Sequence, residues 1–283
     1  MPASSPVRIN LGHLRHMKAQ GRKFAMLTAY DYPTAAAAQA AGLHSLLIGD
    51  SMGTVILGHP STRPVPLALM ITLGEAVRRG APNVYLVGDL PYEAMVSDET
   101  TISAARRFRD EAGCDAVKFE AAAEHDRLVA KLAQAGLETI VHLGLRPQSV
   151  SSADGYRAQA RDEASIQTLV SDACRMVAAG AHMLLLEAVP NEASQAVAAA
   201  VDVPVIGCGA GPACDGHVVV TQDLLGIGTT PTPRFVPVFA QLGRAMEDAM
   251  RCWVQSITDG SYPAPEHLYH MRKHRAAGPT ASS

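Results

Sequence analysis

Short hydrophobic runs alternate with helix-forming segments along most of this chain of 283 residues. Four of these runs follow an Ala-Gly pair and end at an acid or a histidine: AGLHSLLIGD, AGCDAVKFE, AGLETIVH and AGAHMLLLE. Glycine adopts the left-handed conformation that ends many helices, and a continuous apolar run is typical of a strand buried in a parallel sheet. The repeat therefore predicts a helix, a glycine stop, a buried strand and then a polar side chain at the strand's carboxyl end.

The whole pattern predicts eight strands, near residues 25, 46, 85, 116, 140, 184, 204 and 218. Eight strands alternating with helices favour a single closed (β/α)8 barrel, the TIM barrel of about 250 residues. An open doubly wound sheet would have fewer strands and a Gly-rich turn after the first. The predicted helices cover residues 9–20, 34–41, 67–80, 98–112, 124–135, 163–179, 191–200 and 235–258.

The predicted barrel carries a short N-terminal helix and a C-terminal helical extension. The segment VVVTQDLLG, residues 218–226, is predicted to form the last strand with its turn. Residues 144–162 form the longest polar connection, a length that is typical of functional loops. We expect one domain over residues 1–274 and a disordered polar tail over residues 275–283.

Charge and cysteine usage narrow the class of protein. A net charge of −3 and a pI near 6.4 argue against a nucleic-acid surface. The number of cysteines, five, is odd, and no two of them are spaced as CxxC. Neither disulfides nor a zinc site are therefore expected, and this cysteine usage fits a reducing cytoplasm. No apolar stretch approaches the ~18 residues of a membrane span, and the first twenty residues lack the apolar core of a secretory signal. We therefore expect a cytoplasmic protein without membrane or nucleic-acid partners.

Three carboxylates end neighbouring predicted strands: Asp50, Asp89 and Glu120 follow strands two, three and four. The carboxyl ends of barrel strands meet at one rim, which carries the active site in α/β barrels. Carboxylate oxygens with no cysteine nearby suit Mg²⁺ rather than zinc or copper. Each acid alone could instead cap a helix or pair with an arginine, but three on consecutive strands predict a metal site.

Three further ionisable residues are candidates for chemistry. Lys118 lies two residues before Glu120, on the same strand face. It is expected to neutralise a substrate carboxylate or to form a Schiff base, unless it extends to solvent at the rim. Glu187 ends strand six, across the barrel from the acids, and suits a general base, with Glu192 as the alternative acid. His142 ends strand five, where it could orient a loop or move a proton.

Several stretches resemble the ketopantoate hydroxymethyltransferase (3-methyl-2-oxobutanoate hydroxymethyltransferase) family. They run in family order from about residue 24 to 226. The matching stretches are LTAYDYPTA, GDSMGTVILG, GDLPY, AVKFE, HLGLRPQSV, LLLEAVP, and GAGPACDG with DLLG.

This resemblance implies a Mg²⁺-dependent class II aldol reaction. In that reaction 5,10-methylenetetrahydrofolate donates a one-carbon unit to 3-methyl-2-oxobutanoate, giving 2-dehydropantoate for pantothenate synthesis. The resemblance also implies a cytoplasmic homo-oligomer, typically a decamer.

The resemblance assigns roles to individual positions. Asp50, Asp89 and Glu120 match the family's metal ligands, and Glu187 matches its proton acceptor. The positions expected around the 2-oxo acid are Asp50, Ser51, Asp89, Lys118 and His142.

The sequence also departs from the family's usual pattern. Ala121, Ala122 and Ala160 stand where glycines are expected, and Cys208 and His217 replace the usual residues of the IGIGAG and CDGQ motifs. LGHPST, residues 57–62, replaces a Gly-Tyr loop. We expect these positions to lie on loops near the substrate side chain or the pterin, so that they bear on substrate identity rather than on reaction type.

Two other functions stay open from the sequence. One is a diverged lyase, aldolase or mutase on the same barrel, acting on another 2-oxo acid without folate. The other is a barrel without enzymatic activity that binds a metabolite or a partner.

Overall fold

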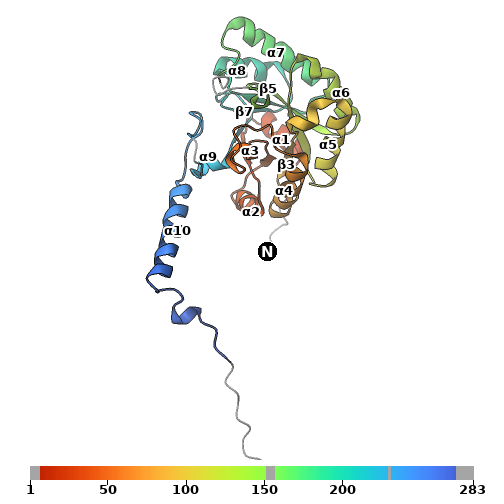
Figure 1. The fold of residues 1–283 in the computed structure, drawn as a ribbon. Helices are drawn as coiled ribbons and strands as arrows, with labels where there is room; N and C mark the ends of the chain where they lie inside the picture. The colour runs from red at the N-terminus through yellow and green to blue at the C-terminus, as the bar shows by residue number, and fades with distance from the viewer. Residues whose placement is uncertain (1–6, 151–156, 229–230, 272–283) are drawn as a thin grey trace, which may run out of the picture.

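Eight parallel strands close into one barrel in the computed structural model, which describes residues 7–150, 157–228 and 231–271 (Figure 1). The strands follow one another around the barrel in sequence order, and β8 pairs with β1. Their bounds are β1 (Phe24–Thr28), β2 (Ser45–Ile48), β3 (Tyr85–Asp89), β4 (Ala116–Glu120), β5 (Glu138–Gly144), β6 (Met183–Glu187), β7 (Val205–Cys208) and β8 (Gly216–Val219). The TIM-barrel prediction is confirmed.

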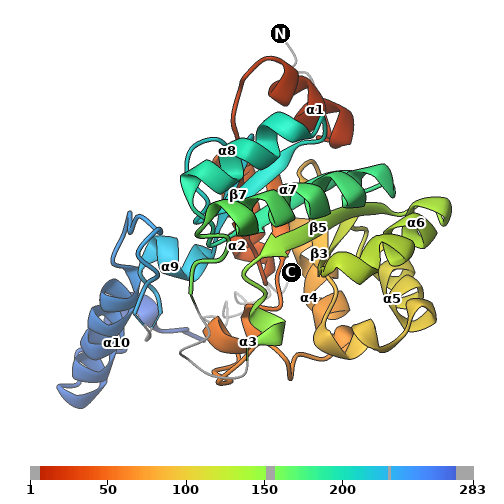
Figure 2. The ribbon, with the colours of Figure 1, turned by 90° about the horizontal axis from the view of Figure 1, so that it is seen from above.

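Helices alternate with the strands and pack on their outer faces (Figure 2). The α-helices are α1 (Leu11–Ala19), α2 (Tyr32–Ala40), α3 (Met52–Val55), α4 (Leu67–Gly80), α5 (Asp98–Asp110), α6 (Asp126–Gln134), α7 (Glu163–Ala178), α8 (Asn191–Ala200), α9 (Thr221–Leu225) and α10 (Leu242–Thr258). Short 3₁₀ turns are η1 (Tyr92–Val96), η2 (Ala123–His125), η3 (Pro147–Ser149) and η5 (Pro265–His267).

The glycines of the Ala-Gly repeat stop helices as predicted. Gly42, Gly113, Gly136 and Gly180 have φ angles of +82°, +68°, +69° and +109°. A side chain would strain each of these backbones, so glycine lets the chain turn from the helix into the next buried strand.

The apolar side chains form two layers, because successive strand residues point to opposite faces. On β3, Leu86 belongs to the outer layer between strands and helices, whereas Tyr85 and Val87 belong to the cluster inside the barrel. Leu14 of helix α1 is fully buried in the same inner cluster. Helix α1 therefore closes the amino-terminal end of the barrel and leaves its carboxyl end free for polar residues.

The region after β8 differs from the prediction. Residues 221–225 form helix α9 rather than strand, because the backbone N–H of Thr221 donates to Oγ1 of Thr28 at 3.0 Å and turns the chain off the sheet. The last long helix starts at Leu242 rather than at residue 235, since Pro233 and Pro237 precede it and interrupt helical hydrogen bonding.

Helix α10 projects away from the barrel in both views (Figures 1 and 2). None of its residues is buried. It is the predicted C-terminal helical extension, whereas the predicted tail over residues 275–283 lies outside the described residues. That residues 1–274 form one domain stays a prediction.

Candidate active site

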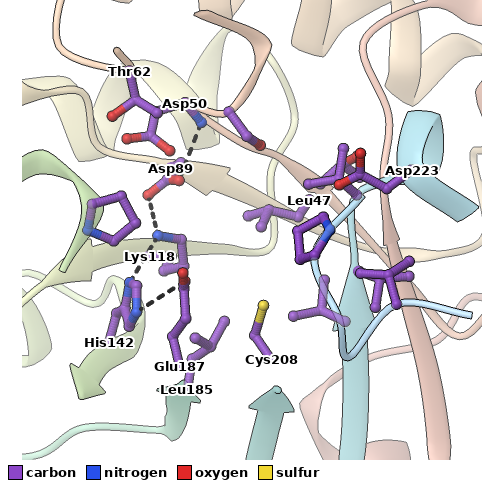
Figure 3. A pocket seen from close by; sticks show the side chains of 18 of the residues that line it. Leu47, Asp50, Thr62, Asp89, Lys118, His142, Leu185, Glu187, Cys208 and Asp223 are labelled. Atoms are coloured by element: carbon purple, nitrogen blue, oxygen red, sulfur yellow. Dashed lines mark hydrogen bonds and ion pairs between the residues drawn. The ribbon is translucent and has the colours of Figure 1, made fainter. Parts of the chain in front are cut away.

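All the residues predicted for the site border one cavity of ≈150 Å³ at the carboxyl ends of the strands (Figure 3). They come from five segments far apart in the sequence. They are Asp50, Ser51, Asp89, Lys118, Glu120, His142 and Glu187.

Strand alternation places most of these side chains in the barrel. Lys118 and Glu120 both point inward from β4, two residues apart, as the sequence predicted. Gly144 on β5 pairs in register with Glu187 on β6. A Cβ at Gly144 would lie 2.4 Å from the carbonyl oxygen of Glu187, and its φ is +92°. Glycine at this position therefore allows the two strand ends to approach where Glu187 enters the cavity.

Lys118 forms a buried ion pair with Asp89. The Nζ and Oδ1 atoms are 2.8 Å apart, and the side chains are 6% and 1% exposed. Burial alone would lower the pKa of Lys118, but the carboxylates of Asp89, Asp50 and Glu120 outweigh it and raise that pKa above its usual value. Lys118 is therefore a charged ammonium, which suits pairing with a substrate carboxylate and not Schiff-base formation, since that requires the neutral amine. It does not extend to solvent at the rim.

The three acids are linked to each other through hydrogen bonds. Oδ2 of Asp89 accepts the backbone N–H of Asp50 at 3.2 Å. The side-chain amide of Gln148 donates to Oδ2 of Asp50 at 2.9 Å, and its backbone N–H donates to Oε1 of Glu120 at 3.0 Å. Gln148 lies in η3, in the HLGLRPQSV stretch, so this motif brings a neutral donor between two acids.

The carboxylate oxygens of Asp50, Asp89 and Glu120 are the candidate ligands for a cation. Burial raises the pKa of Asp89 well above its usual range, with Lys118 opposing and Asp50 adding to the shift. Burial also raises the pKa of Glu120 to about 7, against the effect of Lys118. In the arrangement described, no group of three or more His, Cys, Asp or Glu side chains is close enough to hold a metal ion. The donors are nonetheless all oxygens on one cavity wall, the set that Mg²⁺ prefers.

Glu187 faces the acid cluster from β6. Burial raises the pKa of its carboxyl group to about 8, with Lys118 opposing the shift. A carboxyl group that titrates near neutral pH is suited to accept a proton from a weakly acidic carbon. The alternative acid, Glu192, is exposed in the first turn of α8 and does not line the cavity.

His142 lies between Lys118 and Glu187 (Figure 3). Its Nδ1 is 3.4 Å from Nζ of Lys118, and its Nε2 is 3.4 Å from Oε2 of Glu187. Burial and then the charge of Lys118 lower the pKa of His142 well below its usual value, so the ring is neutral. An ammonium only donates, so Nδ1 is the acceptor and Nε2 carries the proton toward Glu187. Both roles expected for His142, orienting a loop and moving a proton, stay predictions.

Two residues that the sequence did not assign to the site lie at the cavity or contact its lining. The hydroxyl group of Tyr30 lies 2.8 Å from Oγ of Ser51, and burial raises the pKa of Tyr30 above its usual value. Asp223, on α9, lines the cavity away from the other acids. Tyr30 belongs to the LTAYDYPTA stretch and Asp223 to DLLG, so the matching stretches were the available signal for both.

The sequence analysis expected all departures from the family pattern to lie on loops. Two of them, Cys208 and His217, lie on strands instead. Cys208 lies at the end of β7, in register with Glu187, and lines the cavity. His217 lies on β8 and lines a separate groove on the outer face of the barrel. Ala160 has a φ of +52°, so an alanine occupies the left-handed conformation where the family pattern has glycine. The expectation was wrong for Cys208 and His217 because a motif does not show where a strand ends or which strand face a residue occupies.

A closed barrel with a carboxylate cluster, a charged lysine and a facing glutamate at its carboxyl rim defines an α/β-barrel enzyme. The sequence matches the family model for ketopantoate hydroxymethyltransferase over residues 8–265. The chain belongs to this family and is an enzyme of the hydroxymethyltransferase class.

Curated relatives agree along almost the full length. The 3-methyl-2-oxobutanoate hydroxymethyltransferase of Geobacillus kaustophilus (strain HTA426) is 42% identical over 259 residues, covering 91% of this chain and 93% of the relative. The protein of that name from Heliobacterium modesticaldum (strain ATCC 51547 / Ice1) is 40% identical over 265 residues, covering 93% and 96%.

Solved structures share the fold at low sequence identity. The phosphoenolpyruvate phosphomutase of Streptomyces platensis subsp. rosaceus superposes with a TM-score of 0.61 at 13% identity, covering 92% of each chain. A 2,3-dimethylmalate lyase of the PEP mutase/isocitrate lyase superfamily gives a TM-score of 0.60 at 15% identity, covering 92% and 93%. Within the described ranges, no helix is both long and apolar enough to cross a membrane.

Proposed function

We propose that this enzyme transfers a hydroxymethyl group from 5,10-methylenetetrahydrofolate to 3-methyl-2-oxobutanoate, giving 2-dehydropantoate in pantothenate synthesis, with Mg²⁺ as the metal. The observation that carries the proposal is that Glu187, Lys118 and the three acids border one small cavity. A volume of ≈150 Å³ lies below the roughly 300–1,000 Å³ of drug-sized ligand sites, so it suits a small acid.

Each residue has a defined part in the proposed reaction. Lys118 pairs with the substrate carboxylate, and Asp50, Asp89 and Glu120 hold the metal, with Ser51 and His142 beside the acid. When bound, Mg²⁺ supplies stabilisation of negative charge on the keto oxygen as C3 loses its proton. Glu187 accepts that proton, and His142 fixes the orientation of its carboxylate.

The carbon–carbon bond then forms without further help from a covalent enzyme group. Both carbon–nitrogen bonds of the donor's methylene group break: water adds to the methylene carbon, and N10 and N5 leave, each taking one proton of the water. The electron pair left at C3 attacks the resulting formaldehyde carbon, and the formaldehyde oxygen takes the proton held by Glu187 and becomes the hydroxyl group. The charged state of Lys118 supports this class II aldol route over a Schiff base.

We also propose that the enzyme works as a cytoplasmic homo-oligomer, with the decamer expected from the resemblance. All five cysteines are free, as a reducing compartment requires. Helix α10 carries an exposed apolar stripe at helical spacing, which needs a covering partner. Its members are Leu242, Met246, Met250, Trp253, Val254 and Ile257.

A complementary surface lies on the barrel. A mainly apolar groove of ≈470 Å³ runs over the outer faces of β1 and β8 and is bordered by Leu27, Val219 and Phe239. Since α10 projects away from this groove, an apolar helix of another subunit would bury both surfaces.

The test of the reaction is exchange of the C3 proton of 3-methyl-2-oxobutanoate into D₂O, followed by NMR with and without Mg²⁺. We expect exchange that depends on Mg²⁺ and requires no folate. Absence of exchange at every Mg²⁺ concentration would refute the proposed reaction. Turnover of other 2-oxo acids without folate would favour the lyase or mutase alternative.

A further inference from the structure

The cavity has a second end that the proposed chemistry does not use. The acids, Lys118 and His142 lie at one end, whereas Asp223 lies at the other (Figure 3). The apolar residues Val220, Pro233 and Phe235 also line the cavity, and Val220 directly precedes α9, which carries Asp223. A ligand bound at this end would meet one carboxylate and an apolar surface.

Asp223 has no partner among the described residues. Its side chain lines the cavity, the residue is 8% exposed, and no hydrogen bond or ion pair to its carboxylate is found in the part of the chain described. Burial raises the pKa of this carboxyl group above its usual value, without an opposing charge. A buried carboxylate without donors is costly, so a ligand that supplies N–H donors would be stabilised here.

Phe235 provides a flat surface in the same cavity. One face of its ring packs on the backbone at Gly209, where a Cβ would lie 2.7 Å from Cδ1 of Phe235 and where φ is +64°. This close approach fixes the ring, which nevertheless stays 42% exposed. A half-exposed, fixed aromatic ring beside an apolar wall suits stacking of a planar ligand.

We propose that Asp223 and Phe235 form the binding subsite for the 2-aminopyrimidin-4-one ring of the folate donor. The exocyclic amine and the adjacent ring N–H are two parallel donors, which match the two oxygens of one carboxylate. The ring's flat faces match Phe235 and Pro233. The small acid occupies the end of the cavity with Lys118 and the three acids, and the folate ring approaches from the Asp223 end.

This inference rests on the proposed function, since it names the residues that bind the one-carbon donor. It does not depend on the metal ligands or on Glu187. It can therefore be tested by binding alone.

The experiment is anaerobic calorimetry of tetrahydrofolate binding to the full chain. The comparison ligands are a 2-desamino analogue, which lacks one donor, and 4-aminobenzoylglutamate, which lacks the pterin. We expect the wild-type protein to bind tetrahydrofolate at least tenfold more tightly than either, because charge-assisted hydrogen bonds carry the difference.

Two variants locate the contact. Asp223→Asn presents one donor and one acceptor to two N–H groups, and it should weaken tetrahydrofolate binding at least tenfold while abolishing the preference over the 2-desamino analogue. Phe235→Leu should weaken binding about fivefold through lost stacking and should keep that preference. The matched control is Asp202→Asn, an exposed aspartate before β7. Thermal unfolding verifies that each variant is folded. The comparison of tetrahydrofolate with its 2-desamino analogue uses the wild-type protein, so it tests the subsite even if a variant does not fold.

The outcomes separate this inference from the proposed reaction. Equal affinity of the wild-type protein for tetrahydrofolate and its 2-desamino analogue overturns the subsite, as does unchanged binding by Asp223→Asn. If the wild-type protein also exchanges the C3 proton, the proposed reaction stands while the subsite falls. Asp223-dependent binding without proton exchange supports the subsite and refutes the reaction.

Discussion

Nε2 of His142 lies 3.4 Å from Oε2 of Glu187 inside the barrel, where the two side chains are 2% and 20% exposed. The opposite ring nitrogen faces the ammonium group of Lys118. Since Nδ1 faces the ammonium donor of Lys118, Nε2 carries the proton on the side of Glu187, where it makes no hydrogen bond within the described residues. Such contacts commonly shorten when substrate binds.

Replacing His142 with Phe should remove this N–H while keeping the ring volume. We expect C3-proton exchange at pH 7 to fall roughly fivefold to tenfold, as loss of one hydrogen bond predicts. The midpoint of the pH–rate profile should move upward, because the N–H stabilises the ionised carboxylate of Glu187. His142→Gln, which retains an N–H donor, should restore part of both. An unaltered profile in the Phe variant would show that His142 does not act on Glu187.

Glu187→Gln should abolish the proton exchange. An amide of the same shape cannot accept the C3 proton, and loss of a general base costs roughly 10²–10⁴-fold in rate. Binding of 3-methyl-2-oxobutanoate, followed by calorimetry, should change little. The control is Glu192→Gln, since Glu192 is exposed on α8. Wild-type exchange in Glu187→Gln would make the base assignment wrong.

The same variant should stabilise the fold. The pKa of Glu187 is about 8 in the native protein and 4.5 in its ordinary state. Between these values the unfolded chain is ionised while the native protein holds a proton, so native stability falls as pH rises. We expect Glu187→Gln to raise the free energy of unfolding at pH 7 by about 3 kcal/mol, and to have little effect near pH 4. Urea unfolding at both pH values checks the sign.

Lys118→Met should destabilise the protein, because it leaves Asp89 as a buried carboxylate without its cation. Breaking such a pair costs about 3–5 kcal/mol. The double variant Lys118→Met with Asp89→Asn should recover much of the stability in urea unfolding without recovering affinity for the 2-oxo acid. If Lys118→Met bound 3-methyl-2-oxobutanoate as the wild type does, its proposed role would be wrong.

A charge on the apolar stripe of α10 should break the oligomer. Trp253→Asp would place a carboxylate in a contact that must exclude water, and light scattering should show a smaller particle. Asp248→Asn, on the same helix but off the stripe, should leave the particle size unchanged. A monomeric wild-type protein would contradict the proposed assembly.

The local pattern was sufficient to predict most elements of the barrel. Glycines at helix ends and apolar runs act through neighbouring residues. The helix ends at Gly42, Gly136 and Gly180 could therefore be predicted without knowledge of the fold. The region after β8 could not, because the contact between Thr221 and Thr28 joins residues 193 positions apart. That contact, rather than the apolar run 218–226, decides that α9 is a helix.

By itself the sequence determined the eight strands, the family and the acids at the strand ends, because these follow from short-range periodicity and from matching motifs. Only the tertiary structure decided that Lys118 pairs with Asp89, that His142 lies between Lys118 and Glu187, and that Asp223 is unpartnered at the far end of the cavity among the described residues. These relationships depend on which strand ends become neighbours when the barrel closes. Charge and burial at each residue, and therefore its protonation state, are set by that closure.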